Sequence, residues 1–331
     1  MQKILVTGVT GQDGSYLSEF LVLSGFEVYG LVRRSASPNF WRISHLIGKS
    51  NFHLMNGDVT DLGSIIRILK EVEPDRIYNL AAQSFVGISW KEPHHTILTT
   101  GMGAVNIFEA VKLTGIETRI FQASSSEMFG NVELQKSITL ETPLSARSPY
   151  GAAKILAHHA AKVYRDQGLF ISCGISFNHE SSRRGIEFVT RKITWEGSRV
   201  KRGFQKSVQL GNIKSKRDWG HASDYAYGFF LSLEHDKPND YIFATGEVHS
   251  IEEFTKLAAK TIGNFVCDSV ESEERPSDIN WLCGDASFAE EVLGWKRKFS
   301  FEQLVTKMAW ADSERIVPDQ LMDAFYMSDY L

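Results

Sequence analysis

A short apolar run followed by three evenly spaced glycines constrains the fold of this chain most. Ile4–Thr7 is an apolar, β-branched run that stops at Gly8, as a buried parallel strand does. Gly8 permits a tight turn, Gly11 lets the backbone approach a pyrophosphate, and Gly14 permits close packing of a helix on the strand. A helical pattern over 13–24 follows. This turn therefore predicts a dinucleotide-binding fold with phosphates at the helix N-terminus.

Strand and helix patterns alternate along the first half of the chain. Strands are predicted at 28–32, 52–55, 76–80, 119–123 and 170–175, and helices at 62–72, 94–114 and 148–167. Alternation in units of about 30 residues predicts right-handed crossovers and an α/β fold with a doubly wound, Rossmann-like parallel sheet.

Beyond residue 176 the pattern loosens. Helices near 187–201, 221–235, 250–262 and 300–313 predict a smaller mixed α/β lobe over the carboxyl edge of the sheet. We therefore expect a dinucleotide-binding domain over 1–176, a mainly substrate-binding lobe with returning segments over 177–313, and a peripheral C-terminal segment over 314–331.

The composition narrows the class of protein. Of the 331 residues, 43% are hydrophobic and 23% charged, and the net charge is −4, which gives no reason to expect nucleic acid or a membrane surface as partner. Three cysteines lie far apart without a C-x-x-C pair, which predicts reduced thiols in a cytoplasmic protein. No apolar run approaches the roughly 18 residues of a membrane span, and the start leaves no room for a signal peptide.

A tyrosine and a lysine four residues apart indicate the chemistry. Tyr150 and Lys154 fall on one face of the helix over 148–167, and a lysine ammonium beside a phenol favours the phenolate. Tyr150 is thus a candidate to remove a hydroxyl proton. Ser125 and Glu127 follow the preceding strand, where a serine also suits a local cap, whereas Glu127 suits removal of a carbon-bound proton beside a carbonyl. Together they predict a nicotinamide-dependent enzyme that acts on an alcohol carbon and performs an elimination.

The end of the second strand favours NADP over NAD. Arg33, Arg34 and Ser35 follow it with no acid nearby, and two guanidiniums with a hydroxyl suit a ribose 2′-phosphate. A solvated basic loop or a subunit contact is the alternative. The basic segment over 33–50 is long for a strand–helix connection, and it fits a reach towards a neighbouring subunit in a homodimer or homotetramer.

Together these residues resemble the extended short-chain dehydrogenase/reductase family, in particular its GDP-mannose 4,6-dehydratase branch, over roughly residues 3–312. The matching stretches are Gly8–Leu17 (GVTGQDGSYL), Val32–Ser35 (VRRS), Arg147–Lys154 (RSPYGAAK), Phe177–Gly185 (FNHESSRRG), Phe188–Lys192 (FVTRK), Lys216–Ala222 (KRDWGHA) and Ala244–Ser250 (ATGEVHS).

The resemblance implies a mechanism. Tyr150 takes the C4 hydroxyl proton of a GDP-sugar while hydride passes to the nicotinamide, and Glu127 then removes the proton at C5. Water leaves from C6, and the hydride returns there to give a 4-keto-6-deoxy sugar. NADP is regenerated each cycle and stays tightly bound. Ser125 positions the sugar hydroxyls, and Lys154 also holds the nicotinamide ribose.

The candidate binding residues fall into two sets. Cofactor contacts are expected at Gly8, Thr10, Gly11, Gln12, Asp13, Arg33, Arg34, Ser35, Asp58, Val59, Leu80, Ala81, Ala82, Ser84, Tyr150, Lys154, His179 and Arg184. Contacts to the nucleotide sugar are expected at Ser84, Asn178, Lys192, Arg217 and Arg275. His179 and Arg184 also suit structural roles, and Arg217 also suits a surface pair with Asp218.

Alternative substrates and activities stay open on the sequence. Ser125 replaces the family's threonine, His95 replaces a tyrosine, and the stretch from Gly246 to Arg275 is short. The smaller Ser125 and the shortened loop fit a larger C6 substituent, as in a GDP-manno-heptose. A GDP-4-keto-6-deoxymannose reductase or an epimerase shares the fold and the tyrosine–lysine pair, and a non-catalytic dinucleotide sensor is a third class.

Overall fold

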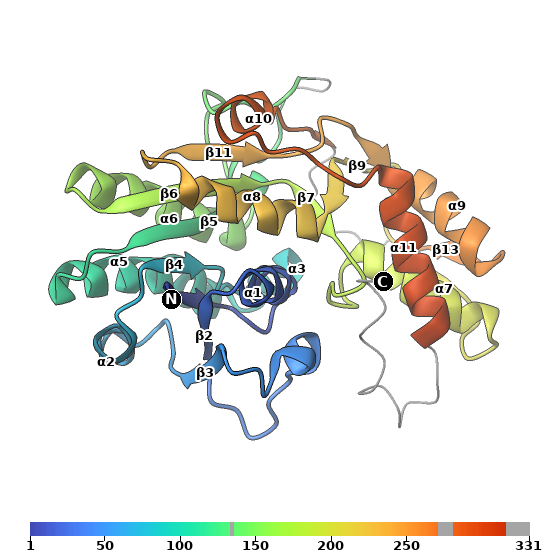
Figure 1. Ribbon diagram of the computed structural model, residues 1–331. Coiled ribbons are helices and arrows are strands. Elements are labelled where there is room, and N and C mark those ends of the chain that lie inside the picture. The colour runs from blue at the N-terminus through green and yellow to red at the C-terminus, as the bar shows by residue number, and fades with distance from the viewer. Residues whose placement is uncertain (133–135, 271–280, 316–331) are drawn as a thin grey trace.

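Seven parallel strands form the central sheet (Figure 1), in the order β11-β6-β5-β4-β1-β2-β3. The computed structural model describes residues 1–132, 136–270 and 281–315. The strands are β1 (Lys3–Thr7), β2 (Glu27–Val32), β3 (Phe52–Asn56), β4 (Arg76–Asn79), β5 (Arg119–Ser125), β6 (Phe170–Ser176) and β11 (Asp240–Phe243). Because Thr7 pairs with Asn79 and Ser125 with Ser176, the carboxyl ends of four central strands meet at one edge.

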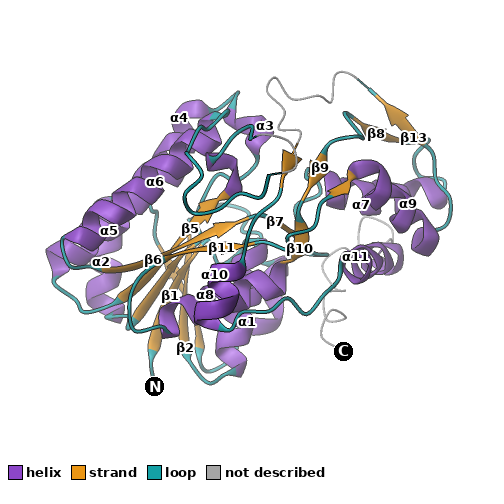
Figure 2. Ribbon diagram, turned by 90° about the horizontal axis from the view of Figure 1, so that it is seen from above, coloured by secondary structure: helices purple, strands orange, loops and turns teal. Residues whose placement is uncertain are grey.

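Helices cover both faces of this sheet, as Figure 2 shows. One face carries α1 (Gln12–Leu23), α8 (Ala222–Glu234) and α10 (Ser287–Leu293). The other carries α2 (Leu62–Val72), α5 (Gly103–Thr114) and α6 (Pro149–Asp166). Shorter segments are α3 (Val86–Ser89), α4 (Pro93–Thr96), a π-helical stretch (Ile97–Met102) and two 3-10 turns (Trp41–Leu46 and Ser126–Met128). The predicted doubly wound parallel sheet is confirmed.

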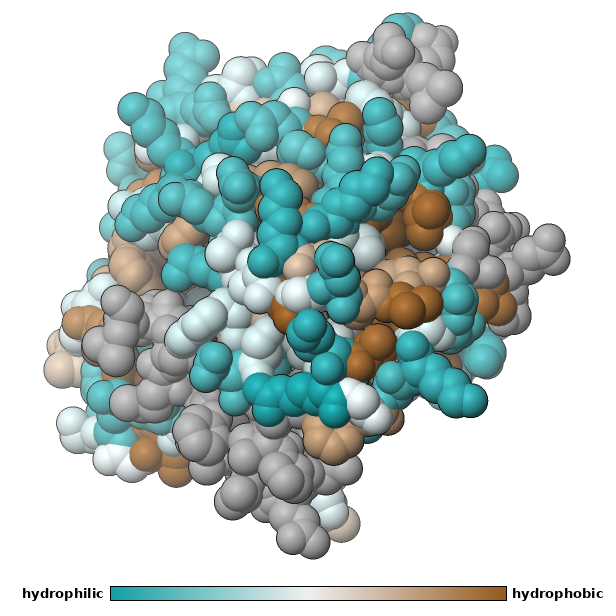
Figure 3. Space-filling model, turned by 90° about the vertical axis from the view of Figure 1, so that its right-hand side faces the viewer, coloured by the Kyte–Doolittle hydropathy of each residue, from teal (hydrophilic) through white to brown (hydrophobic). Residues whose placement is uncertain are grey.

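A smaller lobe has its own apolar core, which includes Ile193, Trp219, Phe254 and Leu304. Its helices are α7 (Val189–Lys201), α9 (Ile251–Ile262) and α11 (Phe301–Arg315). Its short strands are β7 (Asn178–Glu180), β8 (Val208–Leu210), β9 (Lys216–Arg217), β10 (Trp219–His221), β12 (His249–Ser250), β13 (Cys267–Ser269) and β14 (Trp281–Leu282). The face of the molecule on this side carries mostly hydrophilic side chains with smaller apolar groups between them (Figure 3).

Three elements illustrate how the structure differs from the sequence-based expectation. Strand β11 was not expected, because its four residues carry too short a pattern. Helix α8 was expected in the lobe but packs against α1 and the sheet, where Phe229 stacks on Phe121 with ring centroids 4.5 Å apart. The helix expected over 94–114 divides into α4, the π-helical stretch and α5. In that stretch a Cβ on Gly101 would lie 2.8 Å from a methyl carbon of Leu156 on α6.

No helix among the described residues is long and apolar enough to cross a membrane. The expected substrate contact Arg275 and most of the expected segment 314–331 lie outside the described residues.

Candidate active site

A cavity of about 380 Å³ opens at the carboxyl edge of the sheet, and we call it the sheet cavity. Five segments far apart in the sequence supply most of its lining: the turn after β1, the end of β4, the end of β5, the start of α6, and the segment after β6. The sequence-predicted residues that line it are Gly8, Thr10, Gly11, Gln12, Asp13, Leu80, Ala82, Ser84, Ser125, Glu127, Tyr150, Lys154, Asn178, His179 and Arg184.

The glycine turn leaves backbone rather than side chains at the floor of this cavity. Gly8 has φ +67°, and a Cβ there would lie 2.8 Å from the backbone of Leu80. A Cβ on Gly14 would lie 2.3 Å from the carbonyl oxygen of Gly8. Helix α1 begins after Gly11 with no side chain capping its first amides. This arrangement fits a pyrophosphate, because those amides and the positive end of the helix dipole face the cavity.

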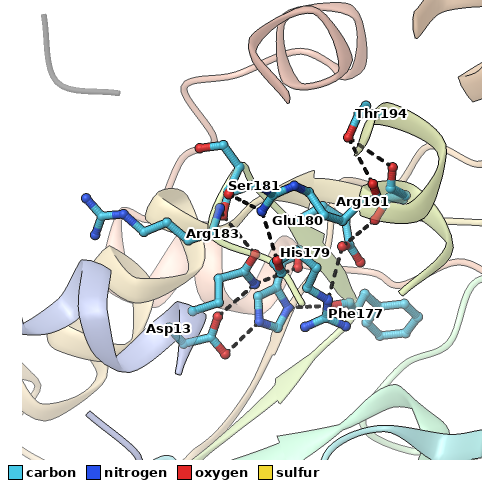
Figure 4. A network of polar contacts seen from close by, with 12 residues as sticks. Asp13, Phe177, His179, Glu180, Ser181, Arg183, Arg191 and Thr194 are labelled. Carbon is cyan, nitrogen blue, oxygen red and sulfur yellow. Dashed lines mark hydrogen bonds and ion pairs between the residues drawn. The ribbon is translucent and has the colours of Figure 1, made fainter. Parts of the chain in front are cut away.

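A partly buried ion pair neutralises the one acid of this turn. His179 Nε2 lies 2.9 Å from Asp13 Oδ2, and its Nδ1 lies 2.7 Å from the carbonyl oxygen of Phe177 (Figure 4). Burial opposes both charges, but their attraction outweighs it and lowers the pKa of Asp13 while raising that of His179. Both imidazole nitrogens face acceptors, which is the environment of an imidazolium. The neutralised Asp13 therefore repels an incoming phosphate less.

The same network continues into the lobe. Ser181 donates to Gln12, 2.8 Å away, and Glu180 accepts from Thr190 on α7 at 2.6 Å. Arg191 on α7 then pairs with Asp312 on α11 at 2.7 Å. The chain of contacts joins the start of α1 to two lobe helices (Figure 4), so the turn and the lobe are held in one arrangement.

Tyr150, Lys154, Ser125 and Glu127 meet in the sheet cavity. Helix α6 places the first two: Ser148 caps it by accepting from the Gly151 amide at 3.1 Å, and Pro149 starts its first turn. Lys154 Nζ donates to the Ala123 carbonyl at 2.7 Å and lies 5.8 Å from the Tyr150 ring centroid.

The pKa shifts of Tyr150 and Lys154 differ from the sequence-based expectation. Burial raises the pKa of Tyr150 to about 12, although the Ser125 hydrogen bond and the Arg184 charge lower it; Glu127 adds to the rise. Burial also lowers the pKa of Lys154 to about 8. The Lys154 ammonium is directed at the Ala123 carbonyl, and the groups that lower the pKa of Tyr150 are Ser125 and Arg184. Lys154 remains mostly charged at pH 7.

A second cavity of about 450 Å³ lies between the sheet and the lobe, and we call it the lobe cavity. Glu127, Asn178 and Phe188 line both cavities, and Lys192 and Arg217 add two cations to the lobe cavity. The expected alternative of a surface pair between Arg217 and its neighbour Asp218 is wrong, because both are buried. Asp218 instead accepts from the amides of residues 245, 246 and 284.

Two buried polar atoms along the cavities have neither a hydrogen-bond partner nor an ion-pair partner in the described part of the chain. They are the Ser176 hydroxyl, on the sheet cavity, and Asn178 Oδ1, on both cavities. A buried polar atom without a partner is costly. A polar ligand in these cavities would provide the missing contacts.

Some predicted contacts lie elsewhere. Arg33, Arg34 and Ser35 are exposed beyond β2, outside the lining of the sheet cavity. Asp58, Val59, Ala81 and His95 also lie outside both linings.

Arg42 lines the sheet cavity but was not a candidate from the sequence. It donates to the carbonyl oxygens of Thr10 at 3.1 Å and Arg183 at 2.6 Å. The basic composition of segment 33–50 was the available signal, although it did not single out this arginine.

The fold and the paired tyrosine and lysine beside a glycine turn define an extended short-chain dehydrogenase/reductase. Among solved structures, the chain is similar to dTDP-glucose 4,6-dehydratase DesIV from Streptomyces venezuelae with NAD and TYD bound. The TM-score is 0.86 at 22% identity, covering 95% of this chain and 98% of that one. It is also similar to RMD from Pseudomonas aeruginosa complexed with NADPH, with a TM-score of 0.79 at 21% identity over 96% and 100% of the two chains.

The family is shown by sequence. The model of the GDP-mannose 4,6 dehydratase family matches residues 5–308. The chain is 44% identical to GDP-mannose 4,6 dehydratase 1 of Arabidopsis thaliana, over 98% of this chain and 93% of that protein. It is 41% identical to the GDP-mannose 4,6 dehydratase of Homo sapiens, over 94% and 91%. The protein belongs to the GDP-mannose 4,6-dehydratase family, which confirms the resemblance inferred from its motifs.

Proposed function

We propose that this protein binds NADP in the sheet cavity and removes water from GDP-mannose, giving the GDP-4-keto-6-deoxy sugar. The observation that carries the proposal is the position of Glu127. It lines both cavities and shares the sheet cavity with Tyr150 and Lys154. A dehydrogenase requires the tyrosine and lysine, whereas a dehydratase also requires an acid beside them. The names of the relatives favour GDP-mannose over the heptose, reductase and epimerase alternatives.

The residues divide the reaction between them. A nicotinamide held in the sheet cavity would supply the hydride chemistry at C4 and C6 of the sugar. Tyr150 removes the C4 hydroxyl proton. Burial raises its pKa, and the hydrogen bond from Ser125 together with the Arg184 charge offsets part of that rise. The new ketone acidifies the C5 proton, which Glu127 removes as water leaves from C6. Lys154 keeps its positive charge beside Tyr150 below pH 8.

The lobe cavity suits the nucleotide diphosphate. Lys192 and Arg217 supply two cations from different elements, α7 and β9. Cationic side chains from separate segments bind and orient a diphosphate, which holds the sugar at the junction of the cavities. Asn178 presents its unpaired oxygen there, which suits a sugar hydroxyl donor.

The choice of NADP rests on the exposed Arg33, Arg34 and Ser35 after β2. Two guanidiniums and a hydroxyl favour a 2′-phosphate, and a ribose without it gains nothing from them. The dissociation constants of NADP and NAD, measured on protein freed of nucleotide, test this part; equal values would reject it.

A homodimer or homotetramer is the proposed assembly. Ile97, Leu98 and Met102 on the π-helical stretch, with Leu156 and Val163 on α6, are apolar and exposed. These two segments pack side by side, so their exposed apolar groups suit burial against a second copy. Static light scattering tests the assembly, and a monomeric mass would reject it.

The central test is incubation of purified protein with GDP-mannose, followed by mass spectrometry. We expect a product lighter by one water molecule, with no net consumption of NADPH. Net oxidation of NADPH would instead indicate a reductase. A parallel incubation with GDP-manno-heptose should give no dehydrated product. Recovery of unchanged GDP-mannose from nucleotide-loaded protein would overturn the proposal.

A further inference from the structure

A third polar side chain, His158, follows Tyr150 and Lys154 on helix α6, one turn further along. Tyr150, Lys154 and His158 are spaced four residues apart, so they lie on one face of the helix. That face packs against β5. Lys154 reaches the Ala123 carbonyl at 2.7 Å, and His158 Nδ1 lies 2.9 Å from the Ser124 hydroxyl. Two successive residues of the catalytic strand end are therefore held by two successive turns of α6.

The protonation of His158 follows from its surroundings. Its Nε2 lies 3.6 Å from Asp240 Oδ2, so the ring proton belongs on Nε2 and Nδ1 accepts from the Ser124 hydroxyl. Burial lowers the pKa of His158 to about 4, against the attraction of Asp240. The ring is thus a neutral acceptor at the pH at which cells work. Both His158 and Ser124 are almost wholly buried.

The group formed by His158, Cys173 and Asp240 is not a metal site. The ligand atoms of His158, Cys173 and Asp240 lie within 4.8 Å of one another. Asp240 is already paired with Arg165 at 2.6 Å and Lys162 at 3.3 Å, however, and two cations repel a third. Burial and Asp240 also raise the pKa of the Cys173 thiol, which disfavours the thiolate that a metal requires.

We propose that His158 is a positioning residue for the dehydration, acting through Ser124 to hold the end of β5 in register with α6. Ser124 lies between Ala123, whose carbonyl holds Lys154, and Ser125, whose hydroxyl bonds to Tyr150 and accepts from the Glu127 amide at 3.2 Å. Loss of the Ser124–His158 hydrogen bond should therefore loosen the contacts that both neighbours of Ser124 make, those of Ala123 and those of Ser125. This inference rests on the proposed function for its kinetic consequence, but not for its structural one.

Two variants remove the contact from opposite sides. Ser124→Ala removes the donor with little change in volume, and His158→Phe removes the acceptor and keeps a ring. Each should lower kcat about five- to tenfold, the loss of one hydrogen bond, and leave KM for GDP-mannose unchanged. Because both act on one contact, the double variant should be no slower than either single variant.

Two further variants separate positioning from packing. In His158→Asn the amide oxygen replaces Nδ1 as acceptor for Ser124, so it should recover most of the lost kcat. His159 is the exposed neighbour on the same helix, and His159→Phe is the matched control that should turn over like the parent. The proposal would be overturned if the double variant lost kcat by the product of the losses in Ser124→Ala and His158→Phe. It would also be overturned if His158→Asn were as slow as His158→Phe.

A second readout does not depend on turnover. Hydrogen exchange of the backbone amides over 123–127, followed by mass spectrometry, should be faster in Ser124→Ala and His158→Phe than in the parent, and unchanged in His159→Phe. Exchange equal to that of the parent in both variants would overturn the inference. A parent that exchanges slowly but leaves GDP-mannose intact would instead refute the proposed function alone.

Discussion

The two cavities that meet at Glu127 offer a ligand different kinds of contact. The sheet cavity presents backbone from a glycine turn and an acid already paired with His179. The lobe cavity presents the long cationic side chains of Lys192 and Arg217. We therefore expect binding in the sheet cavity to depend on the shape of the main chain, so that one added carbon atom weakens it. We expect binding in the lobe cavity to depend on charge, which a single substitution can remove without changing the fold.

The largest effect should come from the junction. Glu127→Gln removes the proposed base and should lower kcat by about 10²–10⁴-fold, while the dissociation constants of NADP and GDP-mannose stay the same. Steady-state kinetics and equilibrium binding measure both. Glu141→Gln, at an exposed loop position, is the control. A folded, nucleotide-loaded Glu127→Gln protein as fast as the parent would show that the junction does not perform the elimination.

A change of shape should affect the sheet cavity alone. The added Cβ of Gly14→Ala would lie 2.3 Å from the Gly8 carbonyl oxygen, so the turn must move. We expect a loss of about 1–3 kcal/mol in the free energy of unfolding and clearly weaker NADP binding. Urea unfolding and titration with NADP measure these. Gly63→Ala, in the first turn of α2, is the matched control, and equal NADP affinity in Gly14→Ala and the parent would contradict the role given to the turn.

A change of charge should affect the lobe cavity alone. Arg217→Gln should raise KM for GDP-mannose about tenfold, the loss of a charge-assisted hydrogen bond, and leave NADP affinity as it was. Lys216→Gln changes the exposed neighbour on β9 and should have no effect. If NADP affinity fell as far as sugar affinity, the two cavities would not be separate in function.

Arg33 and Arg34 refine the comparison of the two cavities, because they would add recognition by charge to the proposed cofactor site. Arg33→Gln should weaken NADP binding about fivefold and leave NAD binding unchanged. Binding titrations with both nucleotides give the ratio, and Lys49→Gln in the same segment serves as control. An equal loss of affinity for NADP and NAD would indicate that Arg33 acts in folding or assembly and not in binding the 2′-phosphate.

The smallest effect concerns pH. The pKa of His179 is raised above 6.5 in the folded protein and that of Asp13 is lowered below 3.8. The His179 contribution is therefore complete below pH 6.5 and is lost as the pH rises through the folded pKa, whereas that of Asp13 is lost as the pH falls through its own. Between pH 6 and pH 9, the free energy of unfolding of the parent, measured with urea, should fall by about 1 kcal/mol relative to that of His179→Gln. The same pH dependence in both proteins would contradict the pairing.

Much of the sheet domain was predictable because its signals are local. The run Ile4–Thr7, the glycines after it and the four-residue spacing of Tyr150 and Lys154 each specify their geometry within a few residues. The motif resemblance also predicted the family. The π-helical stretch at Ile97–Met102 was not predictable, because it depends on the approach of Leu156 from another helix.

By itself, the sequence determined the parallel sheet, the glycine turn and the candidates Ser125, Glu127, Tyr150 and Lys154. Only the tertiary structure decided the pairing of Asp13 with His179, the entry of Arg42 into the sheet cavity and the contact of Ser124 with His158. Asp13 and His179 lie 166 residues apart along the chain, Arg42 and its partner Thr10 lie 32 apart, and Ser124 and His158 lie 34 apart. Their energies come from burial and charge shared between distant segments, and no local pattern carries that information.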